Sequence, residues 1–273
     1  MNNSIVITSA KRTAVGSFGK SLKNITGDSL GSAVISSSIA NSKLKKEEID
    51  EVIMGQVLTA GVGQNSARQA AMKSGIPKEI PAHVVNQVCG SGLRSIASGY
   101  QSIKVGDSKI VIAGGQESMS LSPHAIHLRD GKKIGDAEII DTMIKDGLWD
   151  AFHGYHMGVT AENVAAKFQV TREEQDKFAL NSQKKTQSAI LNNKFDEEMI
   201  KINQNGNILN QDEHPRAELK LSDLEKLKTV FKENGTVTPG NSSGINDGAA
   251  ALLLTTKEEA EKKSIKPLAK IIS

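Results

Sequence analysis

The sequence predicts an α/β fold in which helices cover the faces of a sheet. Short apolar segments rich in β-branched residues recur along the chain and are typical of buried strands. Between them lie segments whose apolar residues repeat at helical spacing. Alternation of this kind over 273 residues predicts a layered α/β core rather than an all-helical or all-β domain.

The first 118 residues carry most of these elements. Asp28 is a candidate N-cap for a helix that extends to residue 42. Leu93, Ile96 and Tyr100 recur at helical spacing and indicate a second helix over residues 90–105. The expected strands of this part lie at 4–10, 51–57, 82–88 and 109–115.

After Gly115 the sequence becomes more polar, and its helical patterns are separated by long irregular stretches. Thr171 and Glu174 form a capping box that opens a helix to about Asn192. The sequence therefore predicts that residues 119–245 form an inserted, mostly helical domain with a small core of its own.

The last part of the chain returns to the first pattern. A strand is expected at 248–256, and Thr256 with Glu259 forms a capping box for the helix that follows. Residues 266–273 begin a further apolar strand, which would leave an exposed sheet edge. The expected divisions are a core of 1–118 and 246–267, the insertion at 119–245, and the start of another half at 268–273.

The composition excludes several classes of protein. Hydrophobic residues make up 38% and charged residues 24%, as in globular proteins that do not enter membranes. The net charge of +3 and the 3% of aromatic residues do not indicate nucleic-acid binding. No signal-peptide pattern is present, and the apolar run at 249–254 is too short to cross a bilayer. A single cysteine allows no internal disulfide, which predicts a cytoplasmic protein.

That cysteine, Cys89, lies in "VVNQVCGSGLRS" between an expected strand and the first turn of an expected helix. A helix N-terminus favours a thiolate, and Gly90 and Gly92 leave room for a substrate to approach. The N–H of Cys89 would then be available to bind an oxyanion. The residues alone leave two interpretations open: a catalytic nucleophile, or a small buried hydrophobic residue.

Other segments contain candidate sites that have ordinary structural explanations as well. His153 and His156 are three residues apart, as are His124 and His127, but no carboxylate pattern completes a zinc site, so we expect no metal. The segment "TPGNSSGIND" reads as a Gly/Ser-rich loop that could expose backbone groups to a ligand. The lysines and the arginine in residues 212–228 are typical of an ordinary solvent-exposed surface.

The segment "NQVCGSGLRSIASGYQSI" with "AGGQESMS" resembles the active-cysteine region of the thiolases, in particular the biosynthetic acetyl-CoA acetyltransferases. Four more segments resemble thiolases in the same order along the chain. They are "AKRTAVGSFGKSL", "GQNSARQAA", "KDGLWDAFHGYHMGVTAENVA" and "TVTPGNSSGINDGAAALLL". The resemblance implies a layered α/β/α thiolase fold with an inserted loop domain.

The resemblance also implies roles for individual residues. Cys89 would be the nucleophile that accepts the acyl group. His156 and Met157 would line the pocket for the pantetheine arm and a short acyl group, and Leu148 would pack near the nucleotide end. Ser243 would contact coenzyme A, and Arg216 would stack beside its adenine.

Three further thiolase motifs do not occur in these 273 residues: Gly-His-Pro, Cys-x-Gly-Gly-Gly and Asn-Glu-Ala-Phe. In the family they supply the base, the second acid and the residue that orients an oxyanion-hole water. The resemblance therefore implies that this chain corresponds to the N-terminal half with the loop domain, and we expect it to be inactive by itself.

The activity that we predict is the condensation of two acetyl-CoA to acetoacetyl-CoA and coenzyme A, and the reverse thiolysis, with no cofactor and in a homotetramer. One alternative is a degradative 3-ketoacyl-CoA thiolase for longer chains, which would need a roomier pocket than Met157 leaves. The other is a non-catalytic module that binds coenzyme A. We expect neither a nucleic acid nor a membrane as a partner, for the predicted activity or for either of the two alternatives.

Overall fold

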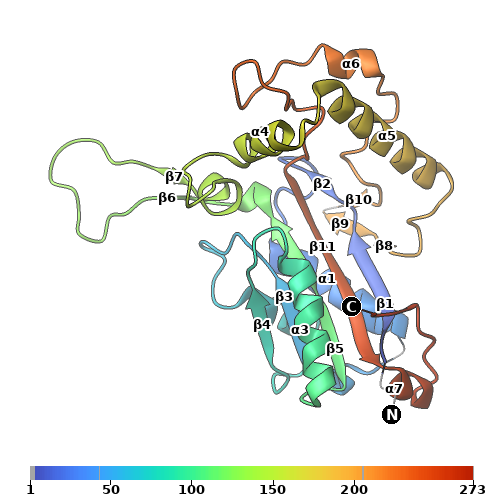
Figure 1. Cartoon of the computed structure of the whole chain (residues 1–273). Helices are drawn as coiled ribbons and strands as arrows, with labels where there is room; N and C mark the ends of the chain where they lie inside the picture. Colours follow the sequence, from blue (N-terminus) through green and yellow to red (C-terminus); the bar gives the residue numbers. More distant parts are fainter. Residues whose placement is uncertain (1–3, 43, 205, 273) are drawn as a thin grey trace. The chain divides into compact units, whose positions relative to one another are not determined.

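The computed structural model describes residues 4–42, 44–204 and 206–272, which form two compact units (Figure 1). The sheet unit comprises residues 1–123, 197–211 and 246–273, and the helical unit comprises 124–196 and 212–245. The mixed α/β architecture confirms the predicted fold class.

The boundaries differ from the expected ones at 119–123 and 197–211: the sequence predicts that these residues belong to the insertion, whereas they lie in the sheet unit. The reason is a set of contacts between segments distant in sequence. Strand β8 (Met199–Ile200) pairs in parallel with β1 (Ile5–Thr13), and Ile202 is buried in the sheet unit's core. Ser120 is bound by the carboxylate of Asp247.

The sheet unit is built around eight strands in the order β12-β1-β11-β5-β3-β4, with β2 added to β11 and β8 to β1. β3, β4 and β5 are parallel to one another, whereas β11 is antiparallel to both β1 and β5. The strands are β1 Ile5–Thr13, β2 Gly16–Ser17, β3 Glu51–Gly55, β4 Ala82–Val85, β5 Ile110–Ser118, β11 Asn246–Thr256 and β12 Ala269–Lys270.

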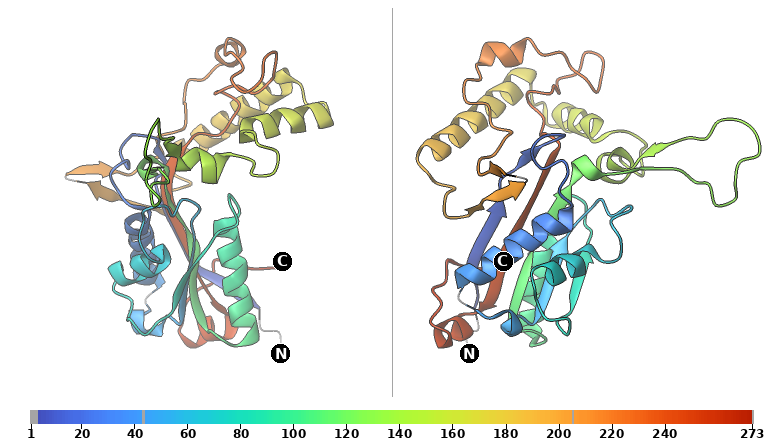
Figure 2. Two further views of the ribbon diagram at one scale, coloured as in Figure 1. Left: turned by 90° about the vertical axis from the view of Figure 1, so that its left-hand side faces the viewer. Right: turned by 180° about the vertical axis from the view of Figure 1, so that it is seen from behind.

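Helices cover both faces of this sheet, as Figure 2 shows. Successive residues of a strand point to opposite faces, and the core follows this alternation. Ile112 and Leu253 belong to the cluster on the face of α1 and α2, whereas Val111 and Leu254 belong to the cluster on the face of α3. The helices are α1 Gly27–Ser42, α2 Ser66–Lys73, α3 Ser91–Val105 and α7 Lys257–Lys262, with 3-10 turns at Lys46–Glu48 and Met119–Leu121.

Most of the expected elements of this unit are present, with shifted ends. The first strand is longer than expected, and the strand expected at 82–88 ends at Val85, where the chain turns toward Cys89. The terminal strand is reduced to the two residues of β12, which pair with β1 at an exposed edge. The hairpin of β9 (Ile202–Gln204) and β10 (Asn207–Leu209) was not expected.

The helical unit is held by polar as much as by apolar contacts. The predicted capping box of α5 is confirmed, because the N–H of Thr171 donates to Glu174 and the N–H of Glu174 donates to the Thr171 hydroxyl. Its elements are β6 His124–Ala125, β7 Ile140–Asp141, a π-helical turn at Met143–Leu148, α4 Met157–Phe168, α5 Arg172–Leu191 and α6 Leu221–Glu225. Of the described helices, none is long and apolar enough to cross a membrane.

Candidate active site

Cys89 lies at the edge of the sheet where three parallel strands end. Gly55 of β3 is in register with Val85 of β4 and with Gly115 of β5. The loops that follow β3 and β4 therefore meet the end of β5 at one edge, which is where open α/β sheets bind ligands. The N–H of Gln56 donates to the carbonyl of Val85 at 3.1 Å and joins the first two of these segments.

The helix after Cys89 begins one residue later than expected. Gly90 is the N-cap of α3 and Ser91 is its first residue, so Cys89 directly precedes the N-cap. The thiol is exposed, and the interpretation of Cys89 as a buried hydrophobic residue is therefore wrong. An exposed side chain before a helix N-terminus is accessible to a substrate.

The turn that carries Cys89 contains a strained residue. Val88 has φ +48°, a left-handed conformation that is rare for a β-branched side chain. The turn is closed by the N–H of Gly90, which donates to the carbonyl of Gln87 at 3.0 Å, and by the N–H of Ser91, which donates to that of Val88 at 3.0 Å. Such strain persists only where the surroundings hold it, and it is frequent at active sites.

Glycines allow the start of α3 to touch the sheet backbone to backbone. A Cβ on Gly55 would lie 2.5 Å from the nitrogen of Gly92 and 2.6 Å from the carbonyl oxygen of Ser91. A Cβ on Gly92 would instead meet its nearest neighbour, Gly115, at 3.9 Å. The close approach therefore depends on Gly55, and it packs the first residues of α3, which follow the Cys89 turn, against Gly55 of β3 and Gly115 of β5.

Glu117, near the end of β5, was not singled out from the sequence. Its carboxylate accepts the N–H of Val57 at 2.8 Å and that of Leu58 at 3.3 Å, and so holds the loop after β3. Burial raises the pKa of Glu117 to about 7; these two N–H groups act in the opposite sense, and the charge of Asp247 adds to the rise. Near neutral pH, Glu117 can therefore hold or release a proton.

This raised pKa predicts a pH dependence of stability. Between the ordinary value of 4.5 and about 7, the unfolded chain has lost the proton of Glu117 while the folded chain still binds it. The folded state then binds more protons, so the free energy of unfolding falls as pH rises, by up to about 1.4 kcal/mol per pH unit. Urea unfolding of the wild type and of Glu117→Gln between pH 5 and 7.5 measures this contribution.

Glu117→Gln is expected to flatten the curve, because the amide does not titrate. Glu258→Gln is the matched control: Glu258 lies in α7, where hydrogen bonding to Lys262 lowers its pKa, so its removal should leave the fall above pH 5 intact. Identical pH dependence in the wild type and in Glu117→Gln would contradict the assignment.

In the helical unit, the start of α4 brings together two of the predicted pocket residues. His156 is the N-cap of α4; its Nδ1 accepts the N–H of Gly158 at 3.0 Å, and its ring stacks on Phe231 with centroids 4.9 Å apart. Gly158 is required there, because a Cβ would overlap the Phe231 ring. Met157 is the first residue of α4 and is 36% exposed, and Leu148 ends the preceding π-helical turn.

Phe231 was missed in the sequence, since an isolated phenylalanine in a polar segment gives no signal. In the structure, the Phe231 ring stacks on the ring of His156. Two of the other histidines singled out from the sequence lie near carboxylates: His153 lies 3.1 Å from Asp150, and His124 lies 4.0 Å from Asp141. Within the described part of the chain, no group of three His, Cys, Asp or Glu residues is placed to hold a metal ion.

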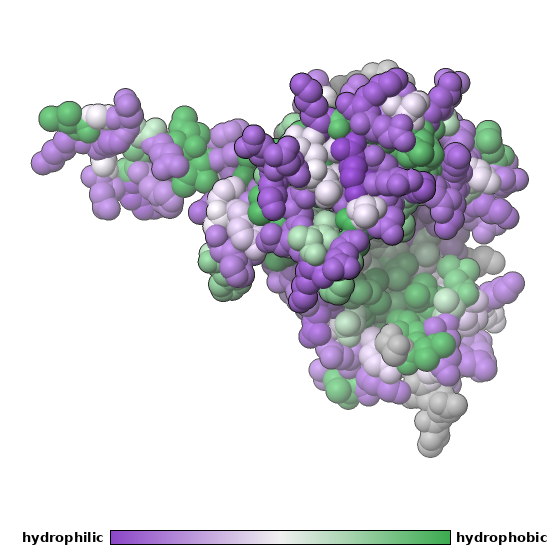
Figure 3. Space-filling view, turned by 45° about the horizontal axis from the view of Figure 1, so that its top comes forward, coloured by the Kyte–Doolittle hydropathy of each residue, from purple (hydrophilic) through white to green (hydrophobic). Residues whose placement is uncertain are grey.

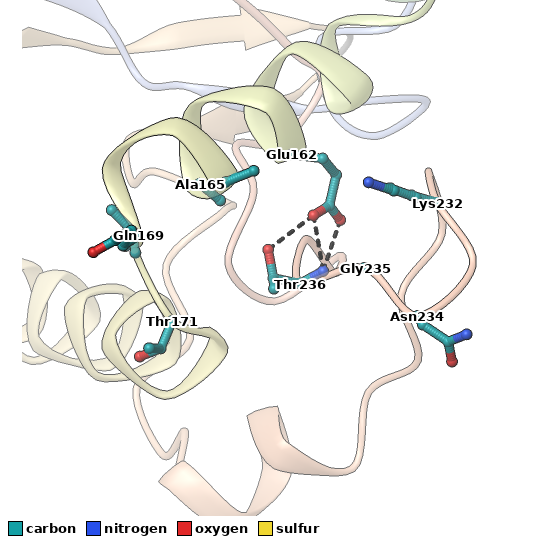
Figure 4. A pocket seen from close by; sticks show the side chains of 10 residues that line it. Glu162, Ala165, Gln169, Thr171, Lys232, Asn234, Gly235 and Thr236 are labelled. Atoms are coloured by element: carbon teal, nitrogen blue, oxygen red, sulfur yellow. Dashed lines mark hydrogen bonds between the residues drawn. The ribbon is translucent and has the colours of Figure 1, made fainter.

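Ser243 is exposed and lies in a loop. Two buried carboxylates of the helices, those of Glu162 and Asp176, accept hydrogen bonds from the beginning of this loop. Glu162 of α4 accepts the N–H of Thr236 (Figure 4). It also accepts the N–H of Val237. Burial raises the pKa of Glu162, but the hydrogen bonds from Val237 and Thr236 outweigh this effect and leave the pKa below its ordinary value. Asp176 accepts the side-chain N–H of Asn241, whose oxygen in turn accepts the N–H of Thr238 at 2.8 Å.

Beside this network lies a cavity of about 410 Å³, lined by the end of α4 and by the loop at 232–236. None of the predicted coenzyme A residues lines it. Arg216 also lies apart from it, in the irregular segment before α6, with an exposed side chain and a backbone N–H bound to Gln183.

The predicted site residues are thus divided between the units. Cys89 belongs to the sheet unit, and Leu148, His156, Met157, Arg216 and Ser243 belong to the helical unit. Within the helical unit the structure joins His156 to Phe231 and pairs it with Trp149, the residue after Leu148.

Comparison with known proteins places this architecture in a family. The model of the family described as "Thiolase, N-terminal domain" matches residues 5–258. The chain belongs to the thiolase family.

Several similar proteins are named acetyl-CoA acetyltransferase. An acetyl-CoA acetyltransferase of Rhizobium meliloti is 54% identical over all of this chain and 70% of its own length. One from Shinella zoogloeoides is 52% identical over 99% of this chain and 70% of its own length. The crystal structure of the Bacillus anthracis acetyl-CoA acetyltransferase is similar with a TM-score of 0.95 and 38% identity, over 99% of this chain and 70% of that one.

Proposed function

We propose that the chain belongs to an acetyl-CoA C-acetyltransferase, which condenses two acetyl-CoA to acetoacetyl-CoA and catalyses the reverse thiolysis through an acetyl-cysteine intermediate. The observation that carries the proposal is the sole cysteine of a thiolase-family chain, exposed on a strained turn at the end of parallel strands. The names of relatives about 50% identical over the whole chain support it.

The chemistry proceeds in two steps. The thiolate of Cys89 attacks the carbonyl carbon of acetyl-CoA, the bond to the sulfur of coenzyme A breaks, and the released thiolate takes up a proton. A second acetyl-CoA then loses an α-proton to a base, and its carbanion attacks the acetyl group on Cys89. A carbon–carbon bond forms, and Cys89 leaves as a thiolate.

Both steps need an acid or base besides Cys89. The three family motifs that supply these groups are absent from the 273 residues. We therefore expect this chain by itself to turn over far more slowly than a version extended to the length of its relatives, because members of a catalytic unit act together. Thiolysis of acetoacetyl-CoA by the two proteins tests this, and equal cysteine-dependent rates would contradict it.

We assign coenzyme A binding to the helical unit. His156 and Met157 would border the pantetheine arm and the short acyl group, with Leu148 toward the nucleotide. The stacking of His156 on Phe231 supports this, because it holds the ring in one orientation. Ser243 would contact the pantetheine, and the network of Glu162 and Asp176 supports a rigid beginning of its loop.

Arg216 is expected to stack on the adenine, since its exposed guanidinium is planar and has an apolar face to offer. Arg216→Ala should then weaken binding of coenzyme A about tenfold and leave binding of a pantetheine fragment without the nucleotide unchanged. Calorimetric titration of both ligands measures the difference, with Lys228→Ala as the control for loss of another positive charge in the segment 212–228. Equal losses for both ligands would remove Arg216 from the adenine end.

The length of the acyl chain that the enzyme accepts in its substrate distinguishes this proposal from a degradative thiolase. Met157 narrows the acyl pocket, so acetoacetyl-CoA should be cleaved with a higher kcat/KM than 3-ketoacyl-CoA homologues of six or more carbons. A preference for the longer substrates would favour the degradative alternative. Binding of coenzyme A without any thiolysis by the extended protein would favour a non-catalytic module.

We also propose a homotetramer in the cytoplasm that needs no cofactor beyond its thioester substrates. The segment joining β6 and β7 projects from its own unit (Figure 1) and carries apolar side chains on its surface (Figure 3). Among them, Ile134 is 91% exposed and Ile139 is 64% exposed. Apolar side chains that stand this far out of a unit are typical of contacts between copies. A monomer in light scattering of the purified enzyme at micromolar concentration would contradict the tetramer.

A further inference from the structure

Two polar side chains bind both backbone groups of the strained residue that precedes the nucleophile. Oδ1 of Asn86 accepts the N–H of Val88 at 3.0 Å. The hydroxyl of Ser91 donates to the carbonyl of Val88 at 2.6 Å and accepts the N–H of Gln87 at 2.9 Å. Val88 is therefore held from the side of the strand and from the side of the helix.

The left-handed conformation of Val88 needs these hydrogen bonds for support. A left-handed conformation at a β-branched residue costs on the order of 1–3 kcal/mol and needs support from its surroundings. The side chain of Val88 is 49% exposed, so packing alone does not hold the residue in place. Ser91 is 4% exposed, so its hydroxyl binds the turn without competition from water.

The two side chains are themselves anchored. Asn86 reaches the carbonyl of Val57 at 3.4 Å, and the N–H of Val57 is held by Glu117. Ser91 begins α3 at the close contact with Gly55. The turn is thus connected to β3 on one side and to α3 on the other.

We infer that Asn86 and Ser91 are positioning residues: they hold Val88 in its left-handed conformation and thereby set the direction in which Cys89 presents its sulfur to the thioester. The inference rests on the proposed role of Cys89 as the nucleophile. Without the two side chains, Val88 relaxes toward extended backbone, and Cys89, the next residue, turns with it. A sulfur displaced by about 1 Å loses up to about a hundredfold in rate with little effect on substrate binding.

The test measures thiolysis of acetoacetyl-CoA by Asn86→Ala and Ser91→Ala variants of the protein extended to the length of its relatives. Each variant should lower kcat about tenfold or more while KM changes less than about twofold. Deuterium exchange at the N–H of Val88 should be faster in Asn86→Ala, which reports the turn independently of activity. Ser95→Ala is the matched control: Ser95 is a buried serine one turn further along α3, and its hydroxyl bonds to Gly92 and Gly114 instead of the turn.

A second substitution separates positioning from general destabilisation. Asparagine adopts the left-handed region far more readily than valine, so Val88→Asn reduces the need for the two supports. In the Val88→Asn background, the loss of kcat caused by Asn86→Ala or Ser91→Ala should shrink to about threefold or less, whereas two independent effects would multiply.

The outcomes distinguish the inference from the proposed function. If Cys89→Ser retains the wild-type rate, the proposed function fails. If Cys89 is essential but Asn86→Ala and Ser91→Ala behave as Ser95→Ala does, or if Val88→Asn leaves their losses unchanged, the positioning role is overturned. Loss of kcat at constant KM together with rescue by Val88→Asn supports it.

Discussion

Replacing Cys89 by serine is expected to abolish acetyl transfer, with a loss of at least about three powers of ten in kcat. A serine hydroxyl is close to the thiol in size, so the turn and α3 should be unchanged, but a hydroxyl is a much weaker nucleophile toward a thioester than a cysteine thiolate. Steady-state thiolysis of acetoacetyl-CoA by the extended protein measures the effect.

The controls for this variant are structural. Cys89 is exposed, so its replacement removes little packing, and the urea midpoint of Cys89→Ser should stay close to that of the wild type. Coenzyme A should still bind, because the residues assigned to it lie in the helical unit. A variant that folds, binds coenzyme A and turns over at the wild-type rate would show that another group is the nucleophile.

The second large effect is expected from Gly55→Ala. The added methyl would lie 2.5 Å from the nitrogen of Gly92 and 2.6 Å from the oxygen of Ser91, and both are backbone atoms that can move only with the whole helix. Overpacking of this kind should lower the free energy of unfolding by about 3 kcal/mol. It should also lower activity, because the start of α3 carries the Cys89 turn.

Gly92→Ala is the matched control, since it adds the same methyl from the other side of the contact. Its nearest neighbour would be Gly115 at 3.9 Å, an ordinary van der Waals distance. Urea unfolding of Gly92→Ala should differ from the wild type by less than about 1 kcal/mol. Equal stabilities of the two variants would mean that the helix does not approach β3 this closely.

Patterns within short segments were sufficient to predict the strand, turn and helix around Cys89. Runs of β-branched residues mark β4 and β5, and helical spacing marks α3. The left-handed φ of Val88 in the turn before Cys89 was not predicted. Valine is among the residues for which such a conformation is least expected.

What the sequence could not show depends on contacts between distant segments. The burial of Glu117 arises only when the loop at 56–58 folds over the end of β5, and nothing in "GGQESMS" indicates it. Residues 197–211 read as part of the insertion, yet β8 pairs with β1 nearly two hundred residues earlier. The resemblance to thiolases supplied the candidate residues of the helical unit, whereas Phe231 emerged only from its stacking on His156.

The most direct test of the central claim is the detection of an acetyl group on Cys89. The extended protein is incubated with acetyl-CoA, quenched in acid and digested, and the peptide that contains Cys89 is analysed by mass spectrometry. The proposal predicts one acetyl group on this peptide, absent in Cys89→Ser and lost when free coenzyme A is added before quenching. An acetylated peptide elsewhere in the chain, or turnover without any acetyl group on Cys89, would contradict it.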